Sequence, residues 1–365
     1  MANILSVISV CGKAGGTTVK LKKLIEESRH NHSVYFALYD KEAIKDYPKN
    51  KIWFKGESNV KVFEGFYGRN FIRHAFKVYE IAKENNIDVI HFYFNFENTF
   101  APILKVLYPK AILVRSIVGF DEPLSKARSY LLGQVLKPID QMIHISKYIK
   151  NLYETDYPIL KDKKNTIIYN TGIHVTENIS EPDYRQKLVS ISGLCARKNL
   201  AVLIKAMKIV VIDNKIDCKL YILGDGPSRK ELEALIGDLN LANNVILVGY
   251  STDVTTYLND CKIYVHPANT EGFGIAVTEA MYMKCPSIVS NAGALPELVV
   301  DGVTGYVVDP YDEKQWSLKI IELLQNKQLC NQMAYEAHDR ALNTFPLSGF
   351  VNNHDLLYDK LVNVN

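Results

Sequence analysis

Residues 266–281 read HPANTEGFGIAVTEAM, and this stretch decides the fold. The apolar residues 263–265 before it are typical of a buried strand, and the residues after Gly274 favour a helix. Gly272 and Gly274 allow the backbone to approach a ligand closely. A helix that begins near Gly274 presents free N–H groups and the positive end of its dipole to an anion. The stretch therefore predicts a strand, a glycine loop and a helix whose N-terminus seats a phosphate or diphosphate.

Two glutamates, Glu271 and Glu279, flank the start of this helix. Eight helical residues rise about 12 Å, which is more than the separation of the acid and base carboxylates of glycosidases. The spacing suits instead two contacts to one elongated ligand, with hydroxyls at both ends and a diphosphate between them. The alternative is that both are surface acids of an amphipathic helix, which the flanking glycines and the preceding strand disfavour.

The rest of the chain alternates short β-branched runs with helical segments, which is the pattern of parallel sheets covered by helices. A first series ends near residue 170, and a second series begins at Leu188 after a turn signal and a polar segment. At 365 residues the chain is long enough for two hydrophobic cores. We therefore predict an α/β protein of two Rossmann-like, doubly wound domains that face each other across a cleft. Strands are predicted at 3–10, 33–38, 60–63, 88–93, 112–115, 141–145, 188–191, 219–223, 245–248, 263–265 and 286–289, and helices at 17–28, 71–83, 199–211 and 252–258.

Composition excludes several classes of protein. With 47% apolar and 23% charged residues the chain is globular, and its net charge of +3 is too small to indicate nucleic-acid binding. The six cysteines contain no C-x-x-C pair, so we expect buried free thiols rather than disulfides or a zinc site. No apolar run reaches the roughly 18 residues of a membrane helix, and residues 4–11 suit a buried strand better than a signal core. We expect a cytoplasmic protein.

Basic residues gather in the N-terminal half, and they have two interpretations. They form either solvated helix faces or a face that rests on an anionic membrane surface, which would make the protein peripheral at the inner face of the membrane. A group of aromatic residues in the same half either belongs to the core or lines an acceptor groove for sugars or a lipid carrier. The basic residues are Lys20, Lys22, Lys23, Arg69, Arg73, Lys77, Arg115, Lys126 and Arg128, and the aromatic residues are Phe92, Tyr93, Phe94, Phe96 and Phe100.

The stretch 266–281 resembles the E-x7-E signature of retaining family 4 glycosyltransferases with the GT-B fold. Other segments follow in the order that this family shows, and the clear resemblance covers about residues 188–310. The resemblance implies an N-terminal acceptor-binding domain over 1–171, a C-terminal nucleotide-sugar-binding domain over 172–345, and a C-terminal helix over 346–365 that crosses back to the N-terminal domain. The other matching segments are 169–172, 224–227, 245–250, 290–293, 295–297 and 301–305.

The resemblance also implies roles on the donor side. Glu271 is expected to contact the donor sugar and Glu279 the ribose, while Lys198 matches the family's diphosphate lysine. The alternative for Lys198 is a solvated helix start. The arginine that the family has five or six residues before this lysine is absent, because a serine and a glycine occupy 192–193. Further donor-binding residues are expected at Gly272, Phe273, Gly274, Ile275, Ala276, Gly224, Tyr250 and Arg197, the last as the candidate replacement for the missing arginine.

The N-terminal half offers a glycine loop and a histidine. The loop at 12–17 opens a helix after the first strand, but it matches neither nucleotide-binding glycine pattern. By the resemblance, Gly15 and Gly16 border the acceptor side. His91 matches the first histidine of the family's H-x-H strand end, and Tyr93 stands where the second would be. The alternative for His91 is a buried core histidine with satisfied hydrogen bonds.

The activity implied by the resemblance is transfer of a sugar, with retention of configuration, from a nucleotide-diphosphate donor to a saccharide or lipid-linked saccharide acceptor. A UDP-sugar donor and hexosyl or N-acetylhexosaminyl transfer in cell-surface polysaccharide or glycoconjugate synthesis are expected. We expect no cofactor and no metal, because neither a D-x-D-type pair nor a His/Cys ligand set is visible. The alternatives are a non-catalytic GT-B-fold partner of another transferase and, less favoured, an epimerase or a phosphorylase. The catalytic candidates are Glu271, Lys198 and His91.

Overall fold

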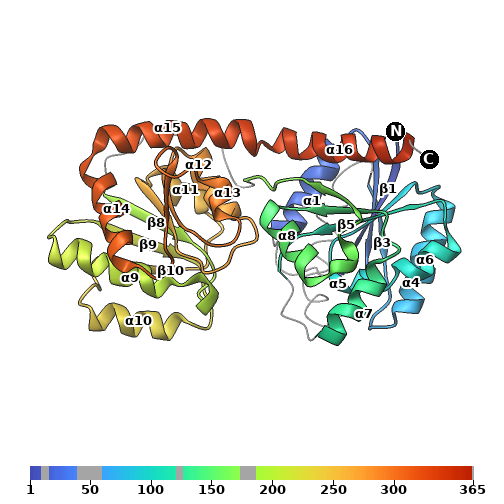
Figure 1. Ribbon diagram of the computed structural model, residues 1–365, viewed down its shortest axis with the longest axis horizontal. Helices are drawn as coiled ribbons and strands as arrows, with labels where there is room; N and C mark the ends of the chain where they lie inside the picture. Colours follow the sequence, from blue (N-terminus) through green and yellow to red (C-terminus); the bar gives the residue numbers. More distant parts are fainter. Residues whose placement is uncertain (10–15, 39–59, 121–125, 173–185, 364–365) are drawn as a thin grey trace. The chain divides into compact units, whose positions relative to one another are not determined.

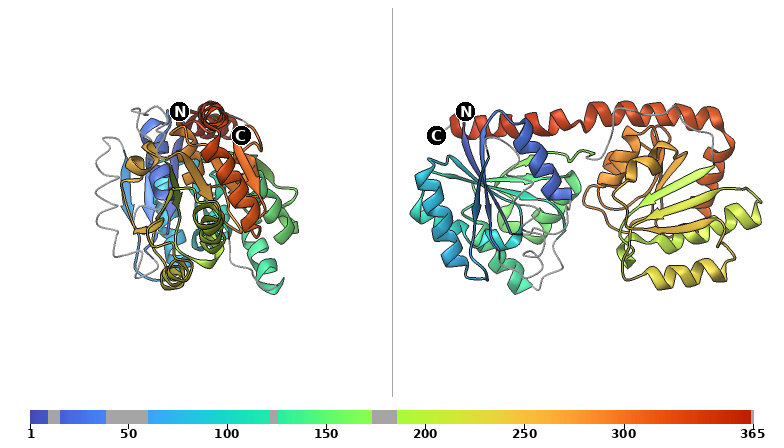
Figure 2. Two further views of the ribbon diagram at one scale, coloured as in Figure 1. Left: turned by 90° about the vertical axis from the view of Figure 1, so that its left-hand side faces the viewer. Right: turned by 180° about the vertical axis from the view of Figure 1, so that it is seen from behind.

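The computed structural model describes residues 1–9, 16–38, 60–120, 126–172 and 186–363. The chain divides into two compact units, which we call unit 1 (Met1–Tyr169 with Ser348–Asn365) and unit 2 (Asn170–Leu347). Figure 1 shows both units, and Figure 2 shows that helices cover the faces of each sheet. Each sheet is parallel throughout, so the predicted class of two Rossmann-like α/β domains is confirmed.

Unit 1 contains a seven-stranded sheet in the order β3-β2-β1-β4-β5-β6-β7. Every residue of β4, β5 and β6 is buried, as expected for central strands of a parallel sheet with helices on both faces. The strands are β1 (Asn3–Ile8), β2 (Asn31–Phe36), β3 (Lys61–Glu64), β4 (Val89–Phe92), β5 (Ile112–Ile117), β6 (Gln141–His144) and β7 (Lys164–Ile167). The helices are α1 (Gly16–Glu27), α4 (Phe71–Glu84), α5 (Asn95–Asn98), α6 (Ala101–Leu107), α7 (Lys126–Leu136), α8 (Lys147–Asp156), the 3-10 turn η1 (Pro158–Leu160) and α16 (Leu347–Asn363).

The C-terminal helix α16 returns to unit 1 after the chain has built unit 2. Its side chains contact residues of unit 1. Ser28 Oγ donates to Asp355 Oδ1 at 2.5 Å, and the Tyr358 hydroxyl lies 2.8 Å from Nδ1 of His91 on β4. Tyr358 is fully buried. A helix held by both polar and buried aromatic contacts is therefore an integral part of unit 1.

Unit 2 contains a six-stranded sheet in the order β10-β9-β8-β11-β12-β13. Its core includes buried residues from β8, β9 and β11 and from the helices α9, α14 and α15. The strands are β8 (Lys187–Ile191), β9 (Lys219–Leu223), β10 (Val245–Gly249), β11 (Ile263–His266), β12 (Ser287–Ser290) and β13 (Gly305–Val308). The helices are η2 (Ala196–Lys198), α9 (Leu200–Lys208), η3 (Ile209–Asp213), α10 (Arg229–Asp238), α11 (Val254–Asn259), α12 (Ile275–Tyr282), α13 (Leu295–Leu298), α14 (Glu313–Gln325) and α15 (Lys327–Thr344).

The predicted basic face is only partly at the surface. Lys20 and Arg115 are 5% and 3% exposed, so both belong to the interior of unit 1 and their assignment to a solvated or membrane-facing surface was wrong. Lys22 and Lys23 pair with Glu26 on α1. Of the other basic residues, Arg69 and Arg73 are exposed and Lys77 is half-buried, whereas the side chains of Lys126 and Arg128 lie outside the described part.

Other expectations from composition can be compared with the described residues. The five described cysteines are free, and four of them are buried. Phe92, Tyr93 and Phe100 are buried in unit 1, as the core interpretation requires. Among the described helices, none combines the length and the apolar character that crossing a bilayer demands.

Candidate functional site

The strand, glycine loop and helix predicted from the central stretch form in unit 2 as β11, a loop and α12. Gly274 is the N-cap of α12 with φ of 107°, a conformation that residues with a Cβ rarely adopt. Val277 N–H donates to Gly274 O, whereas the N–H groups of Ile275 and Ala276 have no hydrogen-bond acceptor among the described residues. The helix therefore presents free amides and the positive end of its dipole, as an anion seat requires.

The seat lies at the carboxyl edge of the unit 2 sheet. The turn η2 follows β8, Gly224 follows β9, and the loop before α12 follows β11, which pairs with β8. The loop after β12 supports the seat from the other side, because Ala294 N–H donates to Glu271 O at 2.8 Å. A Cβ on Gly293 would lie 2.2 Å from that same oxygen, so a glycine is required there. Open parallel sheets bind ligands at this edge.

Glu271 is held by two basic partners. Its Oε2 accepts hydrogen bonds from the Lys198 ammonium and from His266 Nε2, the latter at 3.1 Å, and its Oε1 accepts from Gly272 N–H at 3.2 Å. Burial alone would raise the pKa of Glu271, but His266 and Lys198 outweigh burial and hold that pKa well below its usual value. Burial in turn lowers the pKa of His266, so the imidazole is neutral beside an ionised carboxylate.

His266 and Tyr264 are site residues that sequence reasoning missed. His266 is 2% exposed and Tyr264 is fully buried, and the Tyr264 hydroxyl lies 3.3 Å from His266 Nδ1. The Tyr264 hydroxyl donates to Ile191 O at 3.3 Å, and it lies beside the Nδ1 of a neutral imidazole whose Nε2 donates to Glu271. Tyr264 and His266 are two positions apart on β11, so their side chains lie on the same face of the sheet. The signal in the sequence is a histidine at the end of a buried strand, five residues before Glu271.

Replacing His266 by leucine is expected to lower kcat of sugar transfer about ten-fold, while the Kd for nucleotide changes less than about three-fold. The reason is that Glu271 loses one of its three hydrogen-bond donors, so the orientation of the carboxylate relaxes. Lys198 still holds the carboxylate ionised, so the acid limb of the kcat/KM profile is expected to stay in place while kcat falls, which a general loss of structure and of nucleotide affinity would not produce. Tyr264→Phe is the matched control: it removes only the hydroxyl behind His266 and should give a smaller loss of kcat. An unchanged kcat in His266→Leu would contradict this role.

Arg197 and Lys198 come together with the loop before α12. Arg197 Nη1 donates to Thr270 O at 2.9 Å, and Arg197 O accepts from Asn269 N–H at 2.9 Å. These bonds fix η2 against the loop and carry the Lys198 ammonium to Glu271. The side chains of Lys198 and Glu271 are only 14% and 15% exposed. The alternative of a solvated helix start therefore does not describe Lys198.

Of the other donor-side candidates, Tyr250 is exposed and the others are packed inside unit 2. Gly224 has φ of 136°, and a Cβ there would lie 2.0 Å from Ser192 O, so it is a packing glycine at the end of β9. Tyr250 follows β10 and is 69% exposed. Phe273 is buried, with its ring in edge-to-face contact with Phe345. Glu279 is 4% exposed, and a Cβ on Gly172 would lie 3.2 Å from its Cγ.

The N-terminal candidates are described only in part. Gly15 lies outside the described residues, and Gly16 is the first residue of α1. His91 is fully buried in β4, with Nε2 2.8 Å from Ser116 Oγ and Nδ1 2.8 Å from the Tyr358 hydroxyl. Burial lowers the pKa of His91 far below its usual value. These surroundings are those of the core alternative, and a catalytic role for His91 stays a prediction.

A metal centre was not expected from the sequence. Within the residues that the structure describes, no group of three or more His, Cys, Asp or Glu side chains is arranged to hold an ion. Metal independence of the reaction stays a prediction, and its test is given below.

Comparison with known proteins relates part of the chain to glycosyl transferases. Residues 176–340 match the family model described as glycosyl transferases group 1. An uncharacterized glycosyltransferase of Methanocaldococcus jannaschii is 27% identical over 320 residues, which cover 86% of this chain and 86% of that protein. The N-acetylgalactosamine-N,N'-diacetylbacillosaminyl-diphospho-undecaprenol 4-alpha-N-acetylgalactosaminyltransferase of Campylobacter jejuni is 30% identical over 190 residues, half of each chain.

A solved structure shares the whole fold. The crystal structure of HepE from Anabaena in complex with UDP and glucose superposes with a TM-score of 0.78 at 19% identity, covering 99% of this chain and 100% of that one. The chain is therefore similar to group 1 glycosyl transferases over residues 176–340, and it shares the fold of HepE, with two Rossmann-like units.

Proposed function

We propose that this chain transfers a sugar from a nucleotide-diphosphate donor to a saccharide or lipid-linked saccharide acceptor, with retention of configuration. The observation that carries the proposal is the convergence of free α12 amides, the Lys198 ammonium and the Glu271 carboxylate at the carboxyl edge of the unit 2 sheet. A diphosphate needs positive charge and N–H donors, and a sugar needs acceptors for its hydroxyls. One sugar nucleotide uses both parts of this site.

In the proposed reaction the amides of residues 272–276 and Lys198 hold the diphosphate, Glu271 contacts the donor sugar and Glu279 the ribose. The bond between the anomeric carbon and the phosphate oxygen breaks while the acceptor oxygen bonds to that carbon on the same face. The acceptor proton passes to the departing phosphate oxygen. Because negative charge grows on the diphosphate as it leaves, the fixed amides and Lys198 stabilise the transition state more than the bound donor. Further donor contacts are proposed for Phe273, Gly274, Arg197, Gly224 and Tyr250.

UDP is the proposed nucleotide, and the transferred sugar is a hexose or an N-acetylhexosamine. Support comes from the shared fold of Anabaena HepE, which was crystallised with UDP and glucose. Titration calorimetry is expected to give a tighter Kd for UDP than for GDP or ADP, and EDTA is expected to leave turnover of the UDP-sugar unchanged. The absence of binding for all three nucleotides at millimolar concentration would refute the donor site, and loss of turnover in EDTA would refute metal independence.

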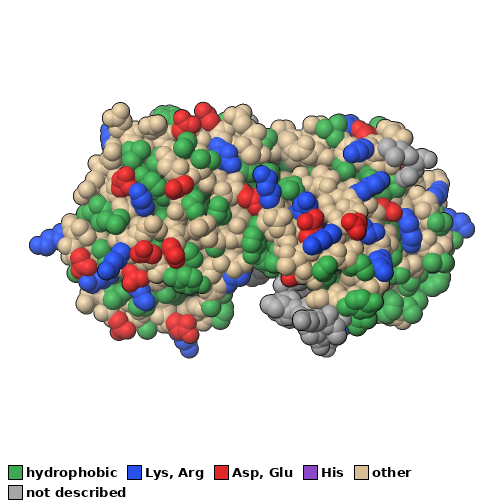
Figure 3. Space-filling view, in the orientation of Figure 1, with side chains coloured by type: hydrophobic (Ala, Val, Ile, Leu, Met, Phe, Trp, Pro, Cys, Tyr) green, Lys and Arg blue, Asp and Glu red, His purple; other side chains and the backbone are tan. Residues whose placement is uncertain are grey.

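A lipid-linked acceptor is the finer part of the proposal, and an exposed surface at α4 of unit 1 supports it. The helix exposes Phe71, Ile72 and Phe76 by 42%, 49% and 48%, and Tyr67 before it by 69%. The exposed Arg73 lies on the same helix. Figure 3 shows hydrophobic and basic side chains together at this end of unit 1. Apolar side chains beside cations suit the interface of an anionic bilayer.

Replacing Phe71 and Phe76 by serine is expected to reduce binding to phosphatidylglycerol vesicles about ten-fold, because two exposed aromatic side chains that would enter the bilayer interface are lost. Co-sedimentation measures the bound fraction. The control is the replacement of Tyr311 by serine in unit 2, since Tyr311 is equally prominent at 70% exposed. Equal binding to phosphatidylcholine and phosphatidylglycerol vesicles, or no loss in the double variant, would remove the membrane part of the proposal and leave the donor site intact.

A non-catalytic partner of another transferase is the second candidate. The observations that favour it are the buried position of His91 and the absence of the family's arginine at 192–193. This candidate predicts nucleotide binding without nucleotide release across a panel of saccharide acceptors. Turnover of any UDP-sugar that is lost in Lys198→Gln excludes it.

A further inference from the structure

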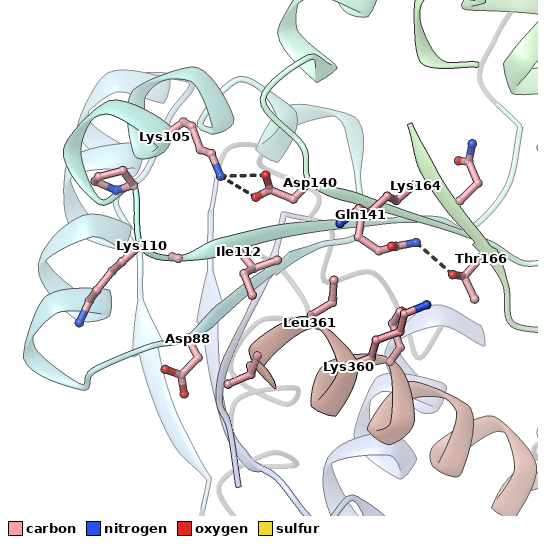
Figure 4. A pocket seen from close by; sticks show the side chains of 15 residues that line it. Asp88, Lys105, Lys110, Ile112, Asp140, Gln141, Lys164, Thr166, Lys360 and Leu361 are labelled. Atoms are coloured by element: carbon pink, nitrogen blue, oxygen red, sulfur yellow. Dashed lines mark hydrogen bonds and ion pairs between the residues drawn. The ribbon is translucent and has the colours of Figure 1, made fainter. Parts of the chain in front are cut away.

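A second pocket lies in unit 1, at the edge of the sheet where strands β4 to β7 begin. Its volume is about 860 Å³, which is within the range of small-molecule sites. One wall is the amino edge of the sheet, including Ile112, Gln141 and Lys164, and the facing wall is the last part of α16, including Lys360 and Leu361. Figure 4 shows these two walls with the cavity between them.

The pocket is separate from the site proposed for sugar transfer. Open parallel sheets bind substrates at the carboxyl ends of their strands, whereas this pocket is lined by the first residues of β5, β6 and β7. All of its lining residues belong to unit 1. The proposed donor residues all belong to unit 2. A ligand of this pocket is therefore distinct from the sugar donor.

The lining carries an excess of positive charge. Four lysines and two aspartates contribute, so the net charge is 4 − 2 = +2. Lys105 neutralises Asp140, with Nζ 2.8 Å from Oδ1 and 2.7 Å from Oδ2, as Figure 4 shows. Lys110 stands 4.9 Å from the ring centroid of Tyr108. The second carboxylate, Asp88, accepts from Asn3 N–H at 2.8 Å, which leaves two ammonium groups.

Those two groups belong to Lys164 on β7 and Lys360 on α16. Both residues are exposed, and no carboxylate lies within ion-pair distance of either among the described residues. They come from opposite walls of one cavity. Two uncompensated ammonium groups that line the same concave surface attract an anion such as a phosphate group.

The rest of the α16 wall is apolar. Leu357, Leu361 and Val362 line it, and Ile112 faces the cavity from β5. Gln141, only 4% exposed, directs Nε2 to Thr166 Oγ1 at 3.0 Å, so the polar part of the sheet wall is already ordered. A ligand that fills this space needs an anionic group at one end and an apolar or ring-shaped body at the other.

We propose that this pocket binds an organic phosphate ester, with its phosphate between Lys164 and Lys360 and its body against α16. Such a ligand touches the sheet and the C-terminal helix together, so it ties α16 to unit 1. The phosphate belongs either to a free soluble ester or to the headgroup of an anionic lipid. Because binding favours the state in which α16 is docked, the ligand slows hydrogen exchange of the α16 amides.

The test uses the full chain and 4-methylumbelliferyl phosphate, with 4-methylumbelliferone as the uncharged control, followed by fluorescence anisotropy. Lys164→Gln and Lys360→Gln are each expected to weaken binding of the phosphate about five- to ten-fold. Lys161→Gln is the matched control, since Lys161 is an exposed lysine of unit 1 that does not line the pocket. Lys198→Gln removes the proposed donor seat and is expected to leave this binding unchanged.

A second measurement on the wild-type chain does not depend on variants that fold. Reductive methylation is expected to modify Lys164 and Lys360 at least five-fold more slowly when the probe is bound, while Lys161 keeps its rate. Vesicles of phosphatidic acid in place of the probe decide between the two sources of phosphate. If the ligand is a lipid headgroup, the vesicles slow methylation of the two lysines; if it is a free ester, they do not. Equal binding of the uncharged control, loss of binding only in Lys198→Gln, or no protection by either phosphate source would overturn the proposal.

Discussion

Replacement of Glu271 by glutamine is expected to lower kcat/KM for sugar transfer by about a thousand-fold, comparable with the loss of a principal charge-stabilising group in other enzymes. The carboxylate accepts from Lys198, His266 and Gly272 N–H at once, and a neutral amide with one acceptor oxygen cannot satisfy all three. In the proposed complex the same carboxylate also accepts from the donor sugar. The lost interactions are therefore those that fix the reacting sugar, not those that hold the nucleotide.

The Kd for UDP separates this role from a general loss of structure. UDP lacks the transferred sugar that would reach Glu271, and Lys198 is released from its ion pair in the variant, so UDP affinity is expected to stay the same or to rise. Glu231→Gln is the matched control, because Glu231 is an exposed glutamate of unit 2 on α10. Calorimetry gives the Kd and nucleotide release gives the rate. A variant that keeps more than one tenth of the wild-type kcat/KM would show that Glu271 does not contact the donor sugar.

Glu271 is also expected to stay ionised throughout the working pH range. Its pKa is lowered by His266 and Lys198, so lowering the pH to about 5 does not protonate it. The acid limb of the wild-type profile therefore reports another group. This differs from a glycosidase, in which a carboxyl group with a raised pKa sets one limb of the profile.

The sequence was sufficient for the strand, the glycine loop and the helix of the proposed anion seat, because these depend on the backbone. Gly274 adopts a positive φ that residues with a Cβ rarely adopt, and it stands at the start of a helix whose first N–H groups need acceptors from outside the helix. The approach of Lys198 to Glu271 was available only through the family resemblance, since the two residues are 73 positions apart. Pairing of β8 with β11 brings them together, and periodicity carries no information on that pairing.

The missed features have physical reasons. β7 contains Lys164, Asn165 and Thr166 and lies at the edge of its sheet, so it lacks the apolar run or alternation by which strands are recognised. His266 was read only as the end of a strand, because its role depends on a carboxylate that the following loop folds back onto it. Lys20 stands between two apolar residues of α1, and its burial results from tertiary packing that the pattern of α1 does not contain.

Replacing Lys20 by methionine is expected to raise the free energy of unfolding of unit 1 by about 3 kcal/mol at pH 7.5. Burial lowers the pKa of Lys20 from 10.5 to about 7, so the unfolded chain binds a proton that the folded chain does not. The free energy of unfolding of the wild type therefore falls as the pH falls from about 10.5 to about 7, and below that range the penalty is constant. Methionine has a similar length and no proton to bind, so it removes this penalty.

Hydrogen exchange of the β1 and β2 amides measures the gain, because these strands lie in the same unit as Lys20. Lys23→Met on the same helix is the control: Lys23 has a 41% exposed side chain paired with Glu26, and its loss should change the stability by less than about 0.5 kcal/mol. The gain from Lys20→Met should shrink as the pH approaches 10.5. A gain that is the same at pH 7.5 and pH 10.5 would mean that packing, and not the buried charge, is responsible.

Two buried histidines of unit 1 are expected to lower the free energy of unfolding at acid pH. Burial lowers the pKa of His32 to about 3 and that of His354, on α16, to about 4, and neither ring nitrogen of His32 has a hydrogen-bond partner among the described residues. As the pH falls, each histidine takes up a proton in the unfolded chain before it does so in the folded chain. The free energy of unfolding therefore falls as the pH falls below about 6.5. His32→Leu should therefore slow exchange of the β2 amides more at pH 5 than at pH 7.5. Lys20→Met should show a gain at pH 5 only slightly larger than at pH 7.5, since the penalty reaches its full value just below pH 7 and is constant from there to pH 5.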